Sequence, residues 1–191
     1  VEKHEITPIL VKRTLDFIKQ HQEERFYIHL WTGDVHDPFH PKEEHLKLFE
    51  EYANNPYEQK FLAVLYQLDL QIGRLLNGLD EMGLTNQTLV ILASDNGPTD
   101  WAFYYEENHA PPGSEGPFRG RKWSLYEGGI RVPFLARWPG HIPAGITNDS
   151  TMLNAVDLFP TLCRLADVPM PMVNFDGEDM SLALTGKAQQ R

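Results

Sequence analysis

Residues 56–97 read PYEQKFLAVLYQLDLQIGRLLNGLDEMGLTNQTLVILASDNG, and this stretch decides the predicted fold class. Its first part carries apolar residues three and four positions apart, which predicts one helix face over about residues 56–82: Phe61, Leu65, Leu68, Ile72, Leu75 and Leu79. Gly83 followed by Leu84 suits a helix end in which glycine takes the left-handed conformation. Residues 88–93 (TLVILA) form a short apolar run typical of a buried strand.

The same alternation of helix and strand continues on both sides of this stretch. Thr7-Pro8 predicts the start of an amphipathic helix, and residues 26–31 (FYIHLW) predict another buried strand. A third strand is expected over residues 130–138, and a helix capped by Asn154 over residues 155–166. We therefore expect an α/β layered fold with a mostly parallel central sheet flanked by helices. In such sheets, ligands bind beyond the carboxyl ends of the strands.

The composition is that of a globular protein with an acidic surface. The chain has 191 residues, 41% hydrophobic and 23% charged, and its 17 basic and 27 acidic residues give a formal net charge of −10. This balance argues against non-specific binding to nucleic acid or to an anionic membrane. No run approaches the roughly 20 apolar residues of a membrane helix, so no membrane span is expected. Cys163, the single cysteine, is expected to be a small buried hydrophobe.

The first polar cluster follows the strand expected at residues 88–93. Asp95 and Asn96 supply a carboxylate and an amide oxygen, and Gly97 allows a sharp backbone turn. Hard oxygen ligands of this kind suit Ca²⁺ or Mg²⁺ better than Zn²⁺. The same three residues also fit an ordinary turn that ends a strand, because Asn-Gly is a strong turn signal.

The second cluster is the loop at residues 32–41, TGDVHDPFHP, which leaves the strand expected at 26–31. Its two histidines, His36 and His40, are four apart, but Pro38 between them argues against a helical metal pair. One functional histidine, acting as proton donor or anion contact, fits this loop better. A histidine exposed in a surface turn is the alternative.

The third cluster is basic, and it is preceded by an aromatic loop. Arg119, Arg121 and Lys122 place three cations within four residues of an acidic protein, where they could gather an anionic group or simply form a solvated loop. The connection at residues 100–117 contains several aromatic side chains: Trp101, Phe103, Tyr104, Tyr105 and His109. They could stack on a sugar or aryl ring, or cover the edge of the sheet.

Four stretches of the sequence together are similar to the sulfatase family of the alkaline phosphatase superfamily. They read TLVILASDNG, GPFRGRKWSLYEGGIRVPFLARWPGHIPAG, DLFPTLCRLADVPMP and DGEDMSLAL. They most resemble the branch of arylsulfatases and N-acetylgalactosamine-6-sulfatases, and the similarity runs from about Phe26 to Leu184. The sequence motif that runs from Lys122 through Tyr-Glu-Gly-Gly to Arg131 is highly specific for this family.

The resemblance implies a role for each cluster. Asp95 and Asn96 would be two ligands of one Ca²⁺ ion. Lys122 would contact the sulfate oxygens and the leaving oxygen, and His36 would contact the sulfate and assist proton transfer to the departing alcohol. Arg119 would be a further substrate-binding residue. The protein containing this chain would then be a sulfuric ester hydrolase acting on aryl or carbohydrate sulfates, with a sulfated small molecule or glycan as its partner, and export from the cytoplasm would be typical.

The sequence departs from the family pattern at the nucleophile. Sulfatases attack with a formylglycine made from the first residue of a Cys/Ser-x-Pro-x-Arg motif, and no such motif occurs here: Cys163 is followed by Arg-Leu-Ala-Asp. We therefore expect residues 1–191 to be the central to C-terminal part of a catalytic domain, without its N-terminal part and C-terminal subdomain. Formylglycine and the remaining calcium ligands would come from the missing N-terminal part, and the chain alone would be inactive.

Two other functions remain open from the sequence. A phosphodiesterase or phosphonate monoester hydrolase of the same superfamily is one, although zinc members tend to place histidine beside the strand-end aspartate, where Asn96 stands here. A non-catalytic pseudoenzyme that binds sulfated glycans is the other. Hydrolysis of phosphate against sulfate esters distinguishes the first, and the presence of a convertible Cys or Ser distinguishes the second.

Overall fold

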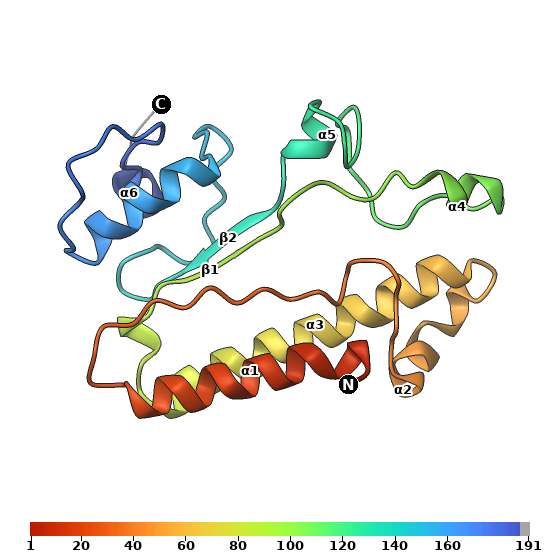
Figure 1. The fold of residues 1–191 in the computed structure, drawn as a ribbon, viewed down its shortest axis with the longest axis horizontal. Helices are drawn as coiled ribbons and strands as arrows, with labels where there is room; N and C mark the ends of the chain where they lie inside the picture. Colours follow the sequence, from red (N-terminus) through yellow and green to blue (C-terminus); the bar gives the residue numbers. More distant parts are fainter. Residues whose placement is uncertain (188–191) are drawn as a thin grey trace. The chain divides into compact units, whose positions relative to one another are not determined.

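The computed structural model describes residues 1–187, which fold into two compact units (Figure 1). One unit contains residues 1–85 and 93–134, and the other contains residues 86–92 and the chain from residue 135 onward. The elements of the chain are, in order, α1 (Lys3–Gln20), α2 (Glu43–Leu46), η1 (Lys47–Tyr52), α3 (Pro56–Glu81), η2 (Thr85–Gln87), β1 (Val90–Ala93), α4 (Ala102–Glu106), α5 (Glu127–Ile130), β2 (Phe134–Arg137), α6 (Ala155–Leu165) and α7 (Ser181–Leu184).

Helix α1 begins four residues before the predicted start at Thr7-Pro8. Its first turn is closed by Glu5, whose carboxylate accepts a hydrogen bond from the backbone N–H of Glu2 at 3.0 Å. Pro8 lies inside the helix and cannot donate to the carbonyl of His4. That carbonyl instead accepts a 3.0 Å hydrogen bond from the side-chain amide of Gln67. The prediction of a start at Thr7 was wrong because a partner from α3 satisfies the group that proline leaves free.

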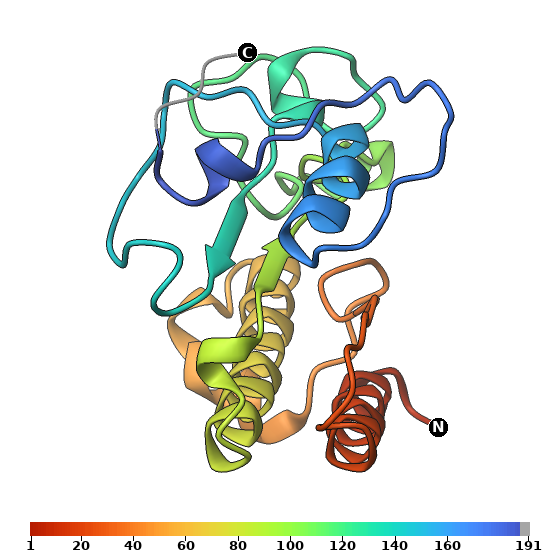
Figure 2. The ribbon, with the colours of Figure 1, turned by 90° about the vertical axis from the view of Figure 1, so that its left-hand side faces the viewer.

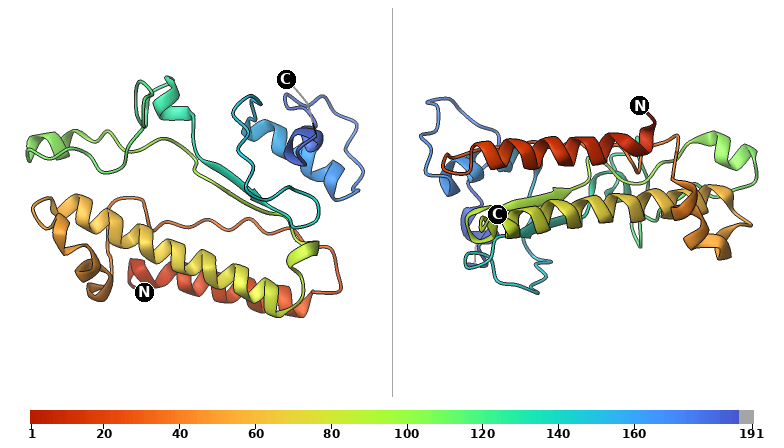
Figure 3. Two further views of the ribbon diagram at one scale, coloured as in Figure 1. Left: turned by 180° about the vertical axis from the view of Figure 1, so that it is seen from behind. Right: turned by 90° about the horizontal axis from the view of Figure 1, so that it is seen from below.

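The first unit is built on α1 and α3, which lie side by side (Figure 3). The absence of a side chain at Gly78 makes room for Leu15, since a Cβ there would come within 2.4 Å of the Leu15 side chain. The buried apolar side chains of the two helices form the core of this unit: Val11, Ile18, Ala63, Val64, Leu68 and Leu79.

Helix α3 confirms the prediction for residues 56–82. Asn55 caps it by accepting hydrogen bonds from the backbone of Tyr57 at 3.2 Å and Glu58 at 3.3 Å. At the other end, Gly83 has a φ of +70°, and the N–H of Leu84 returns to the carbonyl of Leu79 at 2.9 Å. The helix therefore ends at the glycine, as its sequence predicts.

The expected strand at residues 26–31 is extended but is not a strand in the structure. Half-buried and exposed residues alternate along it, the period of an extended chain, and Tyr27 and Trp31 are 73% and 76% exposed. Strand assignment needs backbone hydrogen bonds to a neighbour, and no residue within 1–187 supplies them to this segment. The predicted extended conformation is confirmed, whereas a buried, hydrogen-bonded strand is not formed at residues 26–31 among the described residues.

The sheet that the structure shows has two strands, β1 and β2, whose arrows point in opposite directions (Figure 2). Both strands were expected from the sequence, although each is shorter than its predicted range and Ile130 belongs to α5. Helices and strands are mixed as predicted. A mostly parallel central sheet is not formed by the described residues and stays a prediction.

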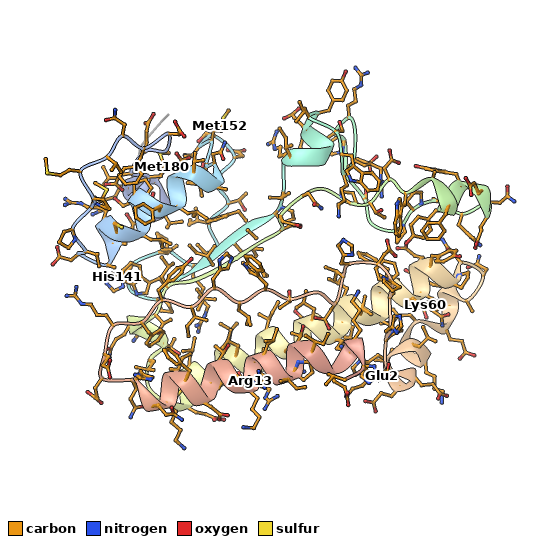
Figure 4. All side chains as sticks on the ribbon, in the orientation of Figure 1. Glu2, Arg13, Lys60, His141, Met152 and Met180 are labelled. Carbon is orange, nitrogen blue, oxygen red and sulfur yellow. The ribbon has the colours of Figure 1, made fainter. Side chains whose placement is uncertain are left out.

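In the second unit, α6 confirms the helix predicted at 155–166, with Asn154 as its cap. The fully buried Asp157 accepts a 2.9 Å hydrogen bond from the N–H of Glu178, and Thr161 accepts one of 2.8 Å from the N–H of Met180. Met180, labelled in Figure 4, is itself fully buried. Cys163 is half-buried, so it is less enclosed than expected. Within residues 1–187, no helix combines the length and apolar character that crossing a membrane requires.

Candidate active site

A buried carboxylate anchors the loop that carries His36 to the two core helices. Asp34 is only 4% exposed, and it accepts hydrogen bonds from the hydroxyl of Thr7 and, at 2.8 Å, from the side-chain amide of Gln67. Thr7 belongs to α1 and Gln67 to α3, so both core helices hold the start of this loop. A buried carboxylate needs such donors, because an unpaired one costs several kcal/mol.

Two further side chains hold the loop on either side of His36. The ammonium of Lys3 donates to the carbonyls of His36 and, at 2.9 Å, of Pro38, and partial burial lowers the Lys3 pKa against the opposing effect of nearby carboxylates. The phenol of Tyr104 donates to the carboxylate of Asp37. Burial, together with this hydrogen bond, raises the pKa of Tyr104. Tyr104 therefore stays a neutral donor, and the backbone around His36 is held at several points.

The imidazole of His36 is oriented by its own loop and faces Lys122. Its Nδ1 lies 2.7 Å from the carbonyl oxygen of Asp37, which can only accept, so Nδ1 carries the proton. Nε2 then has a free lone pair in the neutral ring, and the ammonium of Lys122 donates to it at 3.2 Å. The two residues are 86 positions apart in the chain. Of the two histidines in the loop, the structure brings His36 to this contact.

Glycines interlock the loop after β1 with the loop that carries Lys122. The N–H of Gly97 donates to the carbonyl of Gly129 at 2.8 Å, and the N–H of Lys122 donates to the carbonyl of Pro98 at 2.8 Å. A Cβ on Gly97 would come within 1.9 Å of the carbonyl oxygen of Gly128, and a Cβ on Gly128 equally close to that of Gly120. Only glycine allows the two backbones to come this close. The glycines of this sequence motif therefore set the position of the Lys122 backbone relative to residues 95 and 96.

Asp95 and Asn96 follow β1 and present oxygens with no partner inside the described chain. The Asn96 amide nitrogen donates to the carbonyl of Gly97 at 3.0 Å, which leaves its Oδ1 outward as an acceptor. Among residues 1–187, neither this oxygen nor the exposed carboxylate of Asp95 accepts a hydrogen bond or an ion pair. These two hard oxygens fit part of a Ca²⁺ coordination shell, which needs six to eight. Residues 1–187 contain no group of three or more His, Cys, Asp or Glu side chains arranged to hold a metal.

The arginines of the basic cluster have separate roles. Arg121 is a clamp, because its guanidinium pairs with Glu115 and donates to the carbonyls of Thr99 at 2.7 Å and Gly113 at 2.9 Å. Arg119 is exposed, and its guanidinium lies 4.0 Å above the ring of Tyr126. Arg119 therefore remains available to an anion, whereas the hydrogen bonds of Arg121 are directed to its own loop.

The supporting residues of the site were not found from the sequence. Lys3 and Tyr104 carry no motif and act on the His36 loop from distant parts of the chain. Asp34 lies inside that loop, and no sequence pattern indicates that α1 and α3 hold it. The aromatic composition of residues 100–117 was the only signal for Tyr104. Glu127 pairs with Arg131 at 2.9 Å.

The family of the chain follows from comparison with known proteins. The family model described as Sulfatase matches residues 4–168. The chain belongs to the sulfatase family. It is 34% identical over 175 residues to an N-acetylgalactosamine-6-O-sulfatase of Bacteroides thetaiotaomicron and 34% identical over 167 residues to human arylsulfatase A, covering 87% of this chain in both cases. It spans 32% and 30% of the lengths of these two sulfatases.

Solved structures of sulfatases agree with this assignment. The crystal structure of Ps i-CgsB in complex with k-i-k-neocarrahexaose superposes with a TM-score of 0.80 at 27% identity, over 95% of this chain and 39% of that one. A Bacteroides thetaiotaomicron structure designated BT33336S-sulf, described with the metabolism of multiple glycosaminoglycans, gives 0.77 at 31% identity, over 100% and 39%. The prediction of the sulfatase family from the sequence motifs is therefore confirmed, and the structures that the chain resembles are sulfatases of the alkaline phosphatase-like fold.

Proposed function

We propose that the protein containing this chain is a sulfuric ester hydrolase that cleaves aryl or carbohydrate sulfates, and that residues 1–191 contribute one part of its active site. The observation that carries this proposal is the contact between Lys122 and His36, 3.2 Å apart, beside the interlocked loop of Asp95 and Asn96. A cation and a proton-transferring ring meet in this contact, and the backbone bonds from Gly97 to Gly129 and from Lys122 to Pro98 tie the loop of Lys122 to the loop that follows Asp95 and Asn96. A sulfate ester needs these same groups around its sulfur.

Lys122 is proposed to bind the sulfate group and the oxygen of the departing alcohol. A sulfate ester is an anion, and negative charge grows on the leaving oxygen as the sulfur–oxygen bond breaks. The backbone of Lys122 is held by a hydrogen bond to Pro98 and its ammonium by one to His36, which limits the reorganisation needed to meet that charge. In the ligand-free arrangement it donates to His36, and a bound sulfate would compete for the same protons.

His36 is proposed to deliver a proton to the departing alkoxide. Because Nδ1 is held against the Asp37 carbonyl, Nε2 is the atom that faces the reaction, and a proton must sit there before it can be transferred. Lys122 is the neighbouring donor at Nε2. We propose that the pair shares the task of neutralising the leaving group.

Asp95 and Asn96 are proposed as two ligands of one Ca²⁺ ion, with their Oδ atoms as the donors. Calcium, when bound, supplies a Lewis acid that withdraws charge from the sulfate oxygens. The remaining ligands would come from residues beyond this set, since two oxygens fill only part of its coordination shell.

The nucleophile is proposed to be a formylglycine supplied by sequence other than residues 1–191. The 191 residues contain no Cys/Ser-x-Pro-x-Arg motif from which it could be made, so the chain's own residues do not fit this group. The chain alone is accordingly proposed to be inactive. A mostly parallel central sheet flanked by helices is proposed for the complete catalytic domain, in which the extended segment 26–31 would gain its hydrogen-bond partner.

The test compares matched esters on the complete protein. Hydrolysis of 4-nitrophenyl sulfate should exceed that of 4-nitrophenyl phosphate, and peptide mass mapping should find a formylglycine. Faster phosphate hydrolysis would assign the protein to the phosphoesterases of the superfamily. Tight binding of sulfated glycans without any hydrolysis, and without a convertible Cys or Ser, would assign it as a non-catalytic binder.

A further inference from the structure

Trp123, the residue after Lys122, has a backbone conformation that bulky residues avoid. Residues 121–124 form a turn closed by a 3.0 Å hydrogen bond from the N–H of Ser124 to the carbonyl of Arg121. Trp123 is the third residue of this turn and has a φ of +72°, whereas Lys122 is not among the positive-φ residues. That combination is a type II turn, whose third position favours glycine or asparagine. A tryptophan there is strained by comparison with glycine.

The strained residue is also exposed beside the proposed sulfate contact. Trp123 is 69% exposed, and the ammonium of Lys122 lies 6.0 Å from the centroid of its ring. Leu125 is still more exposed, at 91%, but it has no left-handed backbone, so exposed apolar surface alone does not distinguish Trp123. Burial in the described chain does not explain an indole at this position, because little of it is buried.

We propose that Trp123 is a specificity-determining residue that stacks on the ring of the substrate's alcohol, adjacent to the sulfate held by Lys122. This inference rests on the proposed function. The ligand is expected to be a sulfate ester whose ester oxygen is bonded to a ring or to an atom next to one. The ring would be either an aryl ring or a pyranose that presents its apolar face. The strained turn is retained because it projects the indole beside Lys122.

The geometry makes the effect selective for the ring. Lys122 contacts the sulfate whether or not a ring follows it, so a small anion should not sense the indole. Stacking between rings is expected to contribute about three- to tenfold in affinity beyond the effect of buried area. Replacement by glycine removes the indole and suits the turn, so stability should not fall.

The experiment uses the complete protein with Trp123→Gly and Trp123→Phe. The control is Asn108→Gly, which relieves another left-handed residue, with a φ of 59°, outside the proposed contacts. Three ligands are compared: inorganic sulfate as the ring-free probe, 4-nitrophenyl sulfate and galactose 6-sulfate. KM is measured for ligands that are hydrolysed, and Kd by calorimetry for those that are not, with Tm recorded for every variant.

Trp123→Gly should weaken at least one ring-bearing sulfate about three- to tenfold, leave inorganic sulfate within about twofold, and keep or raise Tm. Trp123→Phe should retain most of the affinity. A change confined to the aryl or to the sugar arm would identify which ring is bound. Equal weakening of all three ligands, a lower Tm, or no change in any ligand would overturn the inference. Absence of hydrolysis in the parent protein would overturn the proposed function alone, because the binding comparison still decides the role of Trp123.

Discussion

The ammonium of Lys122 donates a hydrogen bond to Nε2 of His36 across 3.2 Å. The two residues belong to different loops, because His36 lies between α1 and α2 and Lys122 lies between α4 and α5. The contact is fixed from both sides: the backbone of Lys122 is bonded to Pro98, and the ring of His36 is bonded to the Asp37 carbonyl. Two groups of this chemistry held against each other are suited to bind one anion together.

Replacement of either residue should therefore lower turnover in the complete protein. Lys122→Ala and His36→Ala are each expected to reduce kcat for 4-nitrophenyl sulfate by about 10²–10³, because each removes stabilisation of the leaving oxygen. The double variant should lose less than the product of the single losses, since both side chains act on the same group. Steady-state kinetics of the three variants measure this.

The control variants are Lys12→Ala and His21→Ala, which remove exposed side chains of the same types whose partners are Asp16 and Glu24. Both should keep the parental kcat within about twofold. Fully multiplicative losses at Lys122 and His36 would contradict the idea that they act as a pair.

Asp95 should control the affinity for Ca²⁺. Asp95→Asn removes one negative ligand charge, and the Ca²⁺ concentration that gives half of the full rise in Tm should increase at least about tenfold. Calcium titrations followed by thermal unfolding measure this without relying on activity. Asp100→Asn is the control, because its carboxylate accepts from Tyr105 at 2.8 Å and is not a proposed ligand. An unchanged titration for Asp95→Asn would remove it from the calcium site.

Much of the fold could be predicted because its signals are local. The apolar spacing of α3, its Asn55 cap and the glycine at residue 83 all lie within one stretch of chain, and each is seen in the structure. The same holds for α6 and its cap Asn154. The strand at 26–31 could not be judged in this way, because pairing depends on a neighbour that no local pattern specifies.

The sequence motifs named the residues of the candidate site, whose roles stay predictions, but they did not indicate the side chains that support those residues. Lys122 and Asp95 belong to recognisable sequence motifs. Lys3 and Asp34 act through hydrogen bonds to residues 33 to 35 positions away, and no sequence pattern indicates those contacts. Arg119 and Arg121 look alike in sequence, and only the carbonyls around Arg121 show that it is a clamp. Side-chain roles set by long-range contacts require the folded chain.

The hydrogen bond from Tyr104 to Asp37 should stabilise the fold in a pH-dependent way. Tyr104→Phe is expected to cost about 1–3 kcal/mol in the free energy of unfolding, because the Asp37 carboxylate loses the donor that the fully buried Tyr104 supplies. The raised pKa of Tyr104 means that the folded state keeps its proton where the unfolded state releases it, above about pH 10. This contribution is complete below that pH and is lost as the pH rises further.

Denaturant unfolding of the parent and Tyr104→Phe between pH 7 and 11 measures both effects. The difference in stability between the two proteins should shrink above about pH 10. Tyr27→Phe is the control, because Tyr27 is 73% exposed and its hydroxyl lies outside the hydrogen bond to Asp37. A constant difference between the parent and Tyr104→Phe at every pH would show that the raised pKa does not contribute to stability.

The glycine interlock makes the sharpest prediction about folding of the site. Gly97→Ala places a Cβ 1.9 Å from the carbonyl oxygen of Gly128, and because that oxygen is backbone, relief requires the two loops to separate. We expect a loss of more than about 3 kcal/mol in stability, and a fall in sulfate affinity as Lys122 moves away from Asn96.

Gly73→Ala is the control: it lies inside α3 with nothing within 4 Å of its Cβ, so alanine should raise stability by about 0.5–1 kcal/mol. Chemical denaturation measures the stabilities and calorimetry with inorganic sulfate measures the affinity. Equal stability of the two variants would mean that the loops yield without cost, and that some contact other than the glycines sets the position of Lys122.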